Sequence, residues 1–317
     1  MSKVKHSCII GGTGFIGRRV VDVLLSTGRQ VSVVGRHKQP SRTLPENVRY
    51  FSGDIADKGF MAKRFREADE VIDLAYSSVP KTSFEDPVKD IINNLPASVG
   101  MLELACTLRI RKMVFVSSGG TIYGEPSHLP IPETHPTNPI SPYGITKLAL
   151  EKYAFMFHRL KGLPIVCVRP SNPFGEGQEP FVGQGFIATA IASILSGNEI
   201  SIFGEKGTIR DYIYIDDLAR GILAALDSGW PGECYNIGSG IGRSNLEIIA
   251  SISRVAGKHG LKPKVRHQPG RPFDVSANIL DSSQLREISG WQPESGFDGA
   301  IEQTFNWYLE QSRHGNQ

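Results

Sequence analysis

The sequence predicts an α/β fold in which a doubly wound parallel sheet is followed by a smaller C-terminal lobe. Short apolar runs alternate with longer segments of helical spacing through the first two thirds of the 317 residues. Such alternation implies parallel strands joined by right-handed crossovers. After about Asn172 the rhythm changes, because glycine, proline and isolated polar residues become frequent. A chain of this length fits two domains, or one large domain with an added lobe.

The individual elements follow from these runs. The apolar runs predict buried strands at residues 8–10, 31–34, 71–74, 113–116 and 165–168. Helical spacing is found at residues 18–27, 88–108 and 143–160. In the lobe we expect a helix over residues 185–196 and a short strand over residues 201–203. Residues 214–236 are expected to return to the main sheet.

Charge and composition exclude several classes of protein. The chain has 35 Lys and Arg against 32 Asp and Glu, a formal charge of +3 that is too small for a nucleic-acid-binding protein. It has no run of about 18 apolar residues, so we expect no membrane-spanning helix. Residues 1–6 lead directly into an apolar strand without the pattern of a secretory signal. Because the cysteines stand singly, we expect a cytoplasmic protein without disulfides or a zinc site. The cysteines are Cys8, Cys106, Cys167 and Cys234.

The first apolar run leads into a glycine-rich turn. Gly11, Gly14 and Gly17 have the spacing G-x-x-G-x-x-G, which differs from the usual G-x-G-x-x-G fingerprint. Glycine permits a positive φ and a close approach of backbone to a pyrophosphate, and a helix N-terminus supplies unpaired N–H groups. A plain tight turn would not require three glycines at this spacing. We therefore predict a Rossmann-like dinucleotide site with contacts from Gly11, Gly14, Phe15, Ile16 and Gly17.

The end of the second strand bears on which dinucleotide binds. An acidic residue there would bind the ribose 2′-hydroxyl of NAD, whereas a basic residue would accommodate the 2′-phosphate of NADP. This chain has Arg36 there and no carboxylate in residues 34–38. The cofactor is therefore NAD or NADP with NADP favoured, unless Arg36 belongs to a solvated basic loop. Asp54 and Ile55 follow a strand-like run and either meet the adenine or form a simple turn.

Tyr143 and Lys147 lie one turn apart on the same face of a predicted helix. A phenol with a reference pKa near 10 must lose its proton near neutrality to act as a base, and a fixed ammonium favours the phenolate. Lowering that pKa by about 3 units requires roughly 4 kcal/mol, which Lys147 would supply together with a positive nicotinamide ring. The alternative is a surface pair on an amphipathic helix. The position of the pair after residues 115–118 favours the catalytic interpretation.

Five motifs, in order, resemble those of the extended short-chain dehydrogenase/reductase family. They are residues 11–17 (GGTGFIG), 117–124 (SSGGTIYG), 141–147 (SPYGITK), 169–175 (RPSNPFG) and 210–217 (RDYIYIDD). Within that family the chain is most similar to the NAD(P)-dependent nucleotide-sugar epimerases and dehydratases, particularly to the UDP-glucose 4-epimerases. The resemblance runs from about residue 6 to about residue 310.

The resemblance implies a role for each matching residue. Tyr143 would be the general base and acid, and Lys147 would hold the nicotinamide ribose. Residues flanking the cofactor would be Leu74, Ala75, Asn94, Ser117 and Pro170. Residues binding the nucleotide sugar would be Asn172, the diphosphate-binding Arg210 and Arg271, the ribose-binding Asp274, and Asn278 at a position that limits pocket size. For the two arginines the alternative is ion pairing at the surface with Asp211 and Asp274.

The chain departs from the family pattern at the catalytic turn. The hydroxyl that usually assists the tyrosine falls on Gly119, so either Thr121, or as second choice Ser118, supplies the hydrogen bond, or the site works without it. The same segment lacks the adjacent Asp-Glu pair of 4,6-dehydratases, which disfavours dehydration. Arg36 is the second departure, because it replaces the acidic NAD-binding residue.

The resemblance implies a 4-epimerase of UDP-hexoses or UDP-N-acetylhexosamines that acts through a transient 4-keto sugar. An NADP-dependent reductase of a nucleotide-linked 4-keto sugar is the first alternative. A non-catalytic dinucleotide-binding relative is the second, and the intact Tyr143 and Lys147 pair counts against it. We expect residues 1–172, with 213–238, to bind the cofactor, and residues 173–212 and 239–317 to bind the nucleotide sugar. A homodimer through the helices at 88–108 and 143–160 is also implied, although their apolar faces would equally suit a core.

Overall fold

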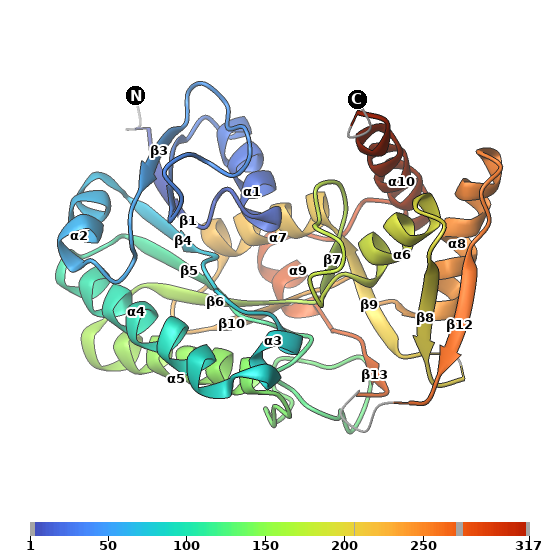
Figure 1. Cartoon of the computed structure of the whole chain (residues 1–317). Coiled ribbons are helices and arrows are strands. Elements are labelled where there is room, and N and C mark those ends of the chain that lie inside the picture. Colours follow the sequence, from blue (N-terminus) through green and yellow to red (C-terminus); the bar gives the residue numbers. More distant parts are fainter. Residues whose placement is uncertain (1–3, 206, 271–274, 315–317) are drawn as a thin grey trace.

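Within the described residues, the main sheet has seven strands. All of them are parallel, which confirms the predicted parallel sheet (Figure 1). The computed structural model describes residues 4–205, 207–270 and 275–314. The strand order is β10-β6-β5-β4-β1-β2-β3, so the chain winds outward in both directions from the centre. The strands are β1 (His6–Ile10), β2 (Gln30–Gly35), β3 (Arg49–Ser52), β4 (Glu70–Asp73), β5 (Lys112–Val116), β6 (Ile165–Pro170) and β10 (Cys234–Ile237).

Helices cover both faces of this sheet. Alternate strand residues point to opposite faces, so Ile9 belongs to one core layer and Cys8 to the other. The first layer packs under α1 and α7, and the second packs under α2, α4 and α5. These helices are α1 (Phe15–Ser26), α2 (Lys58–Glu67), α4 (Pro87–Thr107), α5 (Pro142–Lys161) and α7 (Ile215–Ser228). The short α3 (Pro80–Glu85) precedes α4. The sheet with helices on both faces confirms the doubly wound fold.

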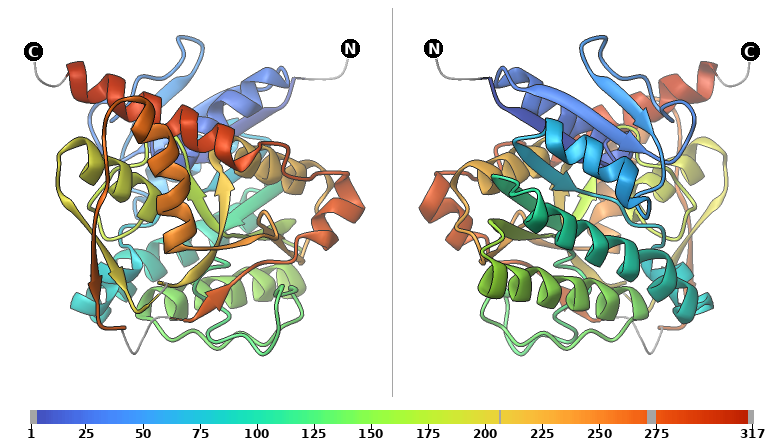
Figure 2. Two further views of the ribbon diagram at one scale, coloured as in Figure 1. Left: turned by 90° about the vertical axis from the view of Figure 1, so that its right-hand side faces the viewer. Right: turned by 90° about the vertical axis from the view of Figure 1, so that its left-hand side faces the viewer.

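Most of the remaining elements form a smaller unit beside the main sheet (Figure 1), which faces the viewer in the left-hand view of Figure 2. It includes two small sheets, with orders β11-β9-β13 and β12-β8, and β7 pairs with β9. The strands are β7 (Asn172–Phe174), β8 (Glu199–Phe203), β9 (Ile209–Tyr214), β11 (Gly242–Ser244), β12 (Lys264–Gln268) and β13 (Ala277–Asn278). The helices of this unit are α6 (Phe186–Leu195), α8 (Asn245–Lys258) and α10 (Phe297–His314). The short α9 (Ser283–Ser289) instead packs against α7 and β10.

Strand β9 brings distant parts of the sequence together. It pairs in parallel with β7, which places Asn172 opposite Tyr212, and with β13, which places Asn278 opposite Arg210. After β9 the chain passes through α7 into β10, which joins the edge of the main sheet beside β6. Among the described helices, none combines the length and hydrophobicity that crossing a membrane requires.

Candidate active site

The glycine turn between β1 and α1 has the geometry of a phosphate-binding loop. Gly11 has a φ of +79°, a backbone conformation that glycine adopts without strain. A Cβ at Gly17 would lie 2.3 Å from the carbonyl oxygen of Gly11, so only glycine allows α1 to begin this close to the strand. Gly14 caps the helix without a side-chain hydrogen bond. The N-terminal N–H groups of α1 therefore suit a pyrophosphate, and these residues fit a dinucleotide.

The end of β4 lies directly beside this turn. A Cβ at Gly11 would meet the Ala75 nitrogen and the Leu74 carbonyl carbon at 3.3 Å. The last residue of β4, Asp73, is buried and accepts a hydrogen bond from the Ala75 N–H at 3.0 Å. Burial raises the pKa of Asp73 to about 6, while that N–H and the charge of Lys147 act in the opposite direction. Sequence reasoning missed Asp73, although a lone acid within the apolar run at 71–74 was a signal.

The expected adenosine end of the cofactor is polar and open. Arg36 is exposed just beyond β2, and the neighbouring His37 carbonyl accepts a hydrogen bond from the Tyr50 hydroxyl at 2.7 Å. Asp54 is also exposed and accepts from the Ala56 N–H at 2.9 Å, which is the simple turn that was one of its two interpretations. Ile55, the adjacent residue, is half-buried.

Lys147 is placed by the start of α5. The Ser141 hydroxyl accepts a hydrogen bond from the Gly144 N–H at 3.1 Å and caps the helix, so the first turn is fixed. One turn further, the Lys147 ammonium donates to the Val116 carbonyl at 2.8 Å and is almost fully buried. Burial lowers the pKa of Lys147 to about 8, although nearby carboxylates, first among them that of Asp73, oppose the change.

The surroundings of Tyr143 shift the pKa of its phenol in both directions. Burial raises the pKa of its phenol, and the negative charge of Asp90 raises it further. A hydrogen bond with the Ser118 hydroxyl acts in the opposite direction and lowers this pKa. The Lys147 nitrogen lies 5.9 Å from the centre of the Tyr143 ring.

Ser118, the second choice, is the hydroxyl that contacts Tyr143. The hydroxyl of Thr121, the first choice, is buried and has no hydrogen-bond partner among the described residues. The Ser117 hydroxyl, at the start of the same turn, is buried and equally without a partner within the described part of the chain.

Packing explains why position 119 carries no side chain. A Cβ at Gly119 would lie 2.4 Å from Leu280 Cδ1 and 2.9 Å from the Arg169 carbonyl oxygen. The Gly119 carbonyl accepts a hydrogen bond from the Asn278 amide at 3.1 Å, so β13 is fastened to the catalytic turn. Asn278 is buried, and its side-chain oxygen has no partner among the residues that the structure describes.

Asn94 supports the loop that follows β4. Its side-chain oxygen accepts from the Ser77 N–H at 2.8 Å and from the Ser77 hydroxyl at 3.1 Å. Its amide nitrogen donates to the Asp90 carbonyl at 2.7 Å. These contacts fix the loop between β4 and α3, which contains Tyr76.

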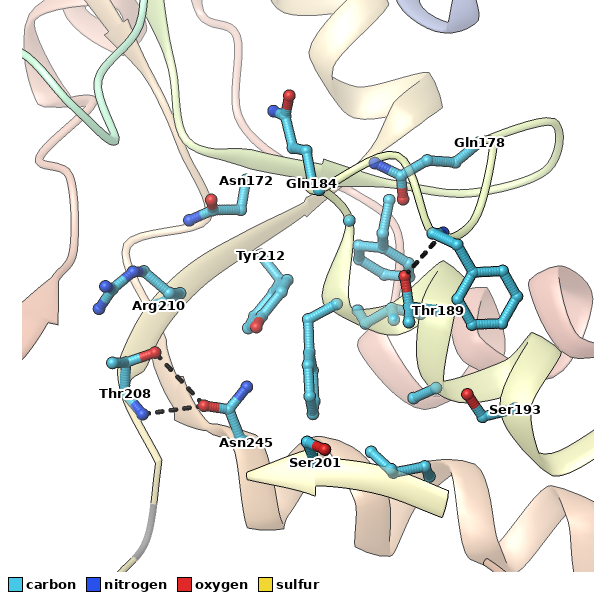
Figure 3. Close-up of a pocket in the computed structure, with 18 of the residues that line it drawn as sticks. Asn172, Gln178, Gln184, Thr189, Ser193, Ser201, Thr208, Arg210, Tyr212 and Asn245 are labelled. Carbon is cyan, nitrogen blue, oxygen red and sulfur yellow. Dashed lines mark hydrogen bonds between the residues drawn. The ribbon is translucent and has the colours of Figure 1, made fainter. Parts of the chain in front are cut away.

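A cavity of about 640 Å³ lies on the lobe side of this site (Figure 3). Asn172 and Arg210 line it from the paired strands β7 and β9. Asp211 was the surface ion-pair partner considered for Arg210. Its carboxylate is buried and accepts hydrogen bonds from the Ser239 hydroxyl at 2.6 Å and from the Leu280 N–H at 3.2 Å, among others. Two further substrate-site predictions, Arg271 and Asp274, lie outside the described residues.

The cofactor side and the cavity are joined by a line of contacts. The ring of Tyr76, which follows Ala75, packs edge-on against Tyr143 with 4.9 Å between ring centres. On the far side of the catalytic turn, a Cβ at Gly120 would lie 3.7 Å from the Asn172 side-chain oxygen. The predicted catalytic residues therefore lie between the glycine turn and the cavity. Pro170, at the end of β6, immediately precedes this junction.

Comparison with known proteins identifies the family. The model of the NAD dependent epimerase/dehydratase family matches residues 7–238. The chain belongs to this family. A family member from Methanocaldococcus jannaschii, described as a putative UDP-glucose 4-epimerase, is 33% identical over 96% of this chain and 99% of its own length.

Solved structures of epimerases in this family have the same fold. The UDP-glucose 4-epimerase of Thermotoga maritima with UDP-glucose is 32% identical, has a TM-score of 0.90, and matches 97% of this chain and 99% of its own. The Thermus thermophilus UDP-glucose 4-epimerase in complex with NAD is 33% identical, has a TM-score of 0.88, and matches 96% of this chain and 99% of its own. The resemblance to the NAD(P)-dependent nucleotide-sugar epimerases is thereby confirmed.

Proposed function

We propose that the protein is an NAD(P)-dependent nucleotide-sugar 4-epimerase acting on UDP-hexoses or UDP-N-acetylhexosamines. The observation that carries this proposal is the position of Tyr143, with Ser118 and Lys147, between the glycine turn and the cavity beside Asn172 and Arg210. The sequence and fold similarity to UDP-glucose 4-epimerases supports the same class of substrate.

The site residues suit each step of an epimerisation. Tyr143 takes the proton of the sugar 4-hydroxyl as a base and later returns it as an acid. When bound, the nicotinamide ring would accept hydride from sugar C4 and return it. Ser118 favours the phenolate, and Lys147 contributes its positive charge. Because hydride must return to the opposite face, the 4-keto sugar has to turn over within the site.

The test is conversion of UDP-glucose to UDP-galactose, followed by NMR. Tyr143→Phe should lower kcat by about 10²- to 10⁴-fold, because it removes the proton acceptor. Tyr153→Phe, a change of the same kind on the exposed side of α5, is the matched control and should keep full activity. Unchanged turnover in Tyr143→Phe would overturn the catalytic proposal.

We propose that NADP is preferred over NAD, since exposed Arg36 suits a 2′-phosphate. Arg36→Ala should then weaken NADP binding by about tenfold or more and leave NAD binding nearly unchanged. Equal effects on both cofactors, measured by fluorescence titration, would contradict this preference.

The NADP-dependent reductase is the second candidate, and Arg36 is the observation that favours it. An epimerase should retain its cofactor during purification, whereas a reductase should consume added NADPH with a 4-keto substrate. A mass spectrum of the ligands that co-purify therefore distinguishes the two reactions.

The proposal of an N-acetylated substrate rests on Asn278, which is smaller than the tyrosine found at a pocket-limiting position. Turnover of UDP-GlcNAc should then be comparable with that of UDP-glucose. Activity of the unaltered protein on the unsubstituted sugar alone would exclude the N-acetylated substrate.

We also propose a homodimer formed through α4 and α5. These neighbouring helices expose several apolar side chains, and two copies would bury them in a four-helix bundle. The exposed side chains are Val88, Ile91, Ile92, Ile145, Met156 and Leu160. Ile92→Glu should give a monomer in light scattering, whereas the control Ile241→Glu, at an exposed apolar site elsewhere, should not.

We propose that residues 1–172 and 213–238 form the cofactor-binding part, and residues 173–212 and 239–317 the nucleotide-sugar-binding part. The pairing of β10 with β6 supports this division.

A cytoplasmic location is proposed from the four single cysteines, which are free.

A further inference from the structure

Asp90 on α4 is a buried carboxylate whose oxygens are occupied by hydroxyl groups. The Tyr76 hydroxyl donates to its two oxygens at 3.3 and 3.4 Å, and the Thr146 hydroxyl donates to one of them at 2.7 Å. The Ser78 hydroxyl is a third donor. Only 3% of Asp90 is exposed. The carboxylate therefore ties α4 to the loop after β4 and to α5, the catalytic helix.

Tyr76, one of these donors, contacts both predicted catalytic side chains. Its ring packs edge-on against Tyr143 with 4.9 Å between ring centres, and the Lys147 nitrogen lies 4.1 Å from the Tyr76 ring centre. An ammonium over an aromatic face is attracted by its negative quadrupole, which replaces part of the lost hydration. The hydrogen bond to Asp90 thus fixes a ring that holds the catalytic pair in place.

Charged and titratable groups face this cluster from each neighbouring element. Asp73 at the end of β4 and Glu151 on α5 act on Lys147, as does Asp90. Around Tyr143, Ser118 comes from the catalytic turn, and Ser83 of α3 accepts the Tyr143 N–H at 3.1 Å.

The charge of Asp90 disfavours the Tyr143 phenolate. The carboxylate raises the pKa of Tyr143, whereas an ammonium or an oxidised nicotinamide would lower it. A base that must also return its proton works best when neither form is strongly favoured. By disfavouring the phenolate, the Asp90 charge makes Tyr143 a stronger base and a weaker acid.

We propose that Asp90 is a positioning residue for the reaction: it holds the Tyr76 ring against Tyr143 and Lys147, and its charge sets the pH range in which Tyr143 exchanges its proton. The reaction itself rests on the proposed epimerase function. The effect of Asp90 on the Tyr143 phenol is independent of any sugar.

Two substitutions should move the titration of Tyr143 in opposite directions. Asp90→Asn keeps the shape and removes the charge, so the phenol and the acid limb of kcat/KM should titrate about one unit lower. Thr146→Val removes a hydroxyl that donates to Asp90, so the negative charge of Asp90 acts more strongly on Tyr143. The phenol and the acid limb of kcat/KM should then titrate at higher pH. Glu103→Gln is the matched control, because it removes a charge from an exposed position of α4, about 20 Å further along the helix.

The experiment has two readouts, both with the cofactor-saturated full-length protein. The first is the pH profile of kcat/KM for UDP-glucose epimerisation. The second is an ultraviolet difference titration of the Tyr143 phenolate, taken between each variant and its Tyr143→Phe counterpart, without sugar. If the wild-type protein does not epimerise the sugar, the proposed function fails, and the phenolate titration still decides the role of Asp90.

A lowered phenolate titration in Asp90→Asn together with a raised one in Thr146→Val supports the proposal. If Asp90→Asn does not fold, the direction of the Thr146→Val shift decides. Unchanged phenolate titrations in the variants that fold, accompanied only by lower melting temperatures, would show that Asp90 is a structural tie between helices. A shift of equal size in Glu103→Gln would also overturn the proposal.

Discussion

Restoring a serine at position 119 should destabilise the protein. Gly119→Ser supplies the hydroxyl that the family pattern places there, but the new Cβ would lie 2.4 Å from Leu280 Cδ1. Apolar atoms normally sit about 3.5–4.0 Å apart, so Leu280 would have to retreat by about 1 Å. Leu280 is fully buried and has little room to move.

The size of the loss follows from what else surrounds the site. The carbonyl oxygens of Arg169 and Pro170 would lie 2.9 and 3.1 Å from the same Cβ, and as main-chain atoms of β6 they cannot rotate away. Overpacking of a core costs about 1–3 kcal/mol. Because the main chain also blocks Gly119→Ser, we expect the upper end of this range, about 3 kcal/mol.

The assay is urea unfolding of the wild type, of Gly119→Ser and of Gly120→Ser. The last is the control, since its Cβ would meet its first neighbour, the Asn172 side-chain oxygen, at an ordinary 3.7 Å. Leu280→Ala should lower the free energy of unfolding less in the Gly119→Ser protein than in the wild type, because the smaller side chain makes room for the serine. A free energy of unfolding for Gly119→Ser within about 0.5 kcal/mol of the wild type would refute the packing explanation.

Three further predictions follow from the site and its supports. Gly17→Ala should abolish cofactor binding in a fluorescence titration, because its methyl group would lie 2.3 Å from a main-chain oxygen; binding within threefold of wild type would contradict this. Glu151→Gln should lower the free energy of unfolding by about 3–5 kcal/mol, since it leaves the buried Arg169 guanidinium, now bound to Glu151 at 2.7 Å, without its counter-ion; a loss under about 1 kcal/mol would argue against it. Because burial raises the folded-state pKa of Asp73 to about 6, its contribution to stability is lost as pH rises from about 4 to 6. Between pH 4 and 6, the free energy of unfolding of Asp73→Asn should therefore fall by up to about 3 kcal/mol less than that of the wild type. Identical urea unfolding curves for the two proteins at each pH would contradict this assignment.

The sequence was informative where function needs a local pattern. The alternation of apolar runs predicted the parallel sheet, and the glycines at 11, 14 and 17 predicted the turn that the structure forms. The spacing of Tyr143 and Lys147 predicted that both would lie on one helix, because helical periodicity is set by neighbouring residues.

Features that depend on tertiary packing were not predicted. The choice between Ser118 and Thr121 depends on how the turn after β5 is oriented, and spacing does not encode this orientation. Gly119 is required because of Leu280, which comes from the distant C-terminal part of the chain. Asp90 belongs to no motif, and its relation to Tyr143 exists only once α4 and α5 are packed together.

The attachment of β13 to the catalytic turn limits how the molecule can open. The Asn278 side chain donates to Gly119, and the neighbouring residues Ile279 and Asp281 form main-chain hydrogen bonds with Ile131 at 2.7 and 2.9 Å. A rigid rotation of the whole lobe away from the main sheet would break all of these bonds at once. Ligand exchange is therefore expected to rely on local movement at the mouth of the cavity, while β13 and the turn that contains Gly119 keep their relative position.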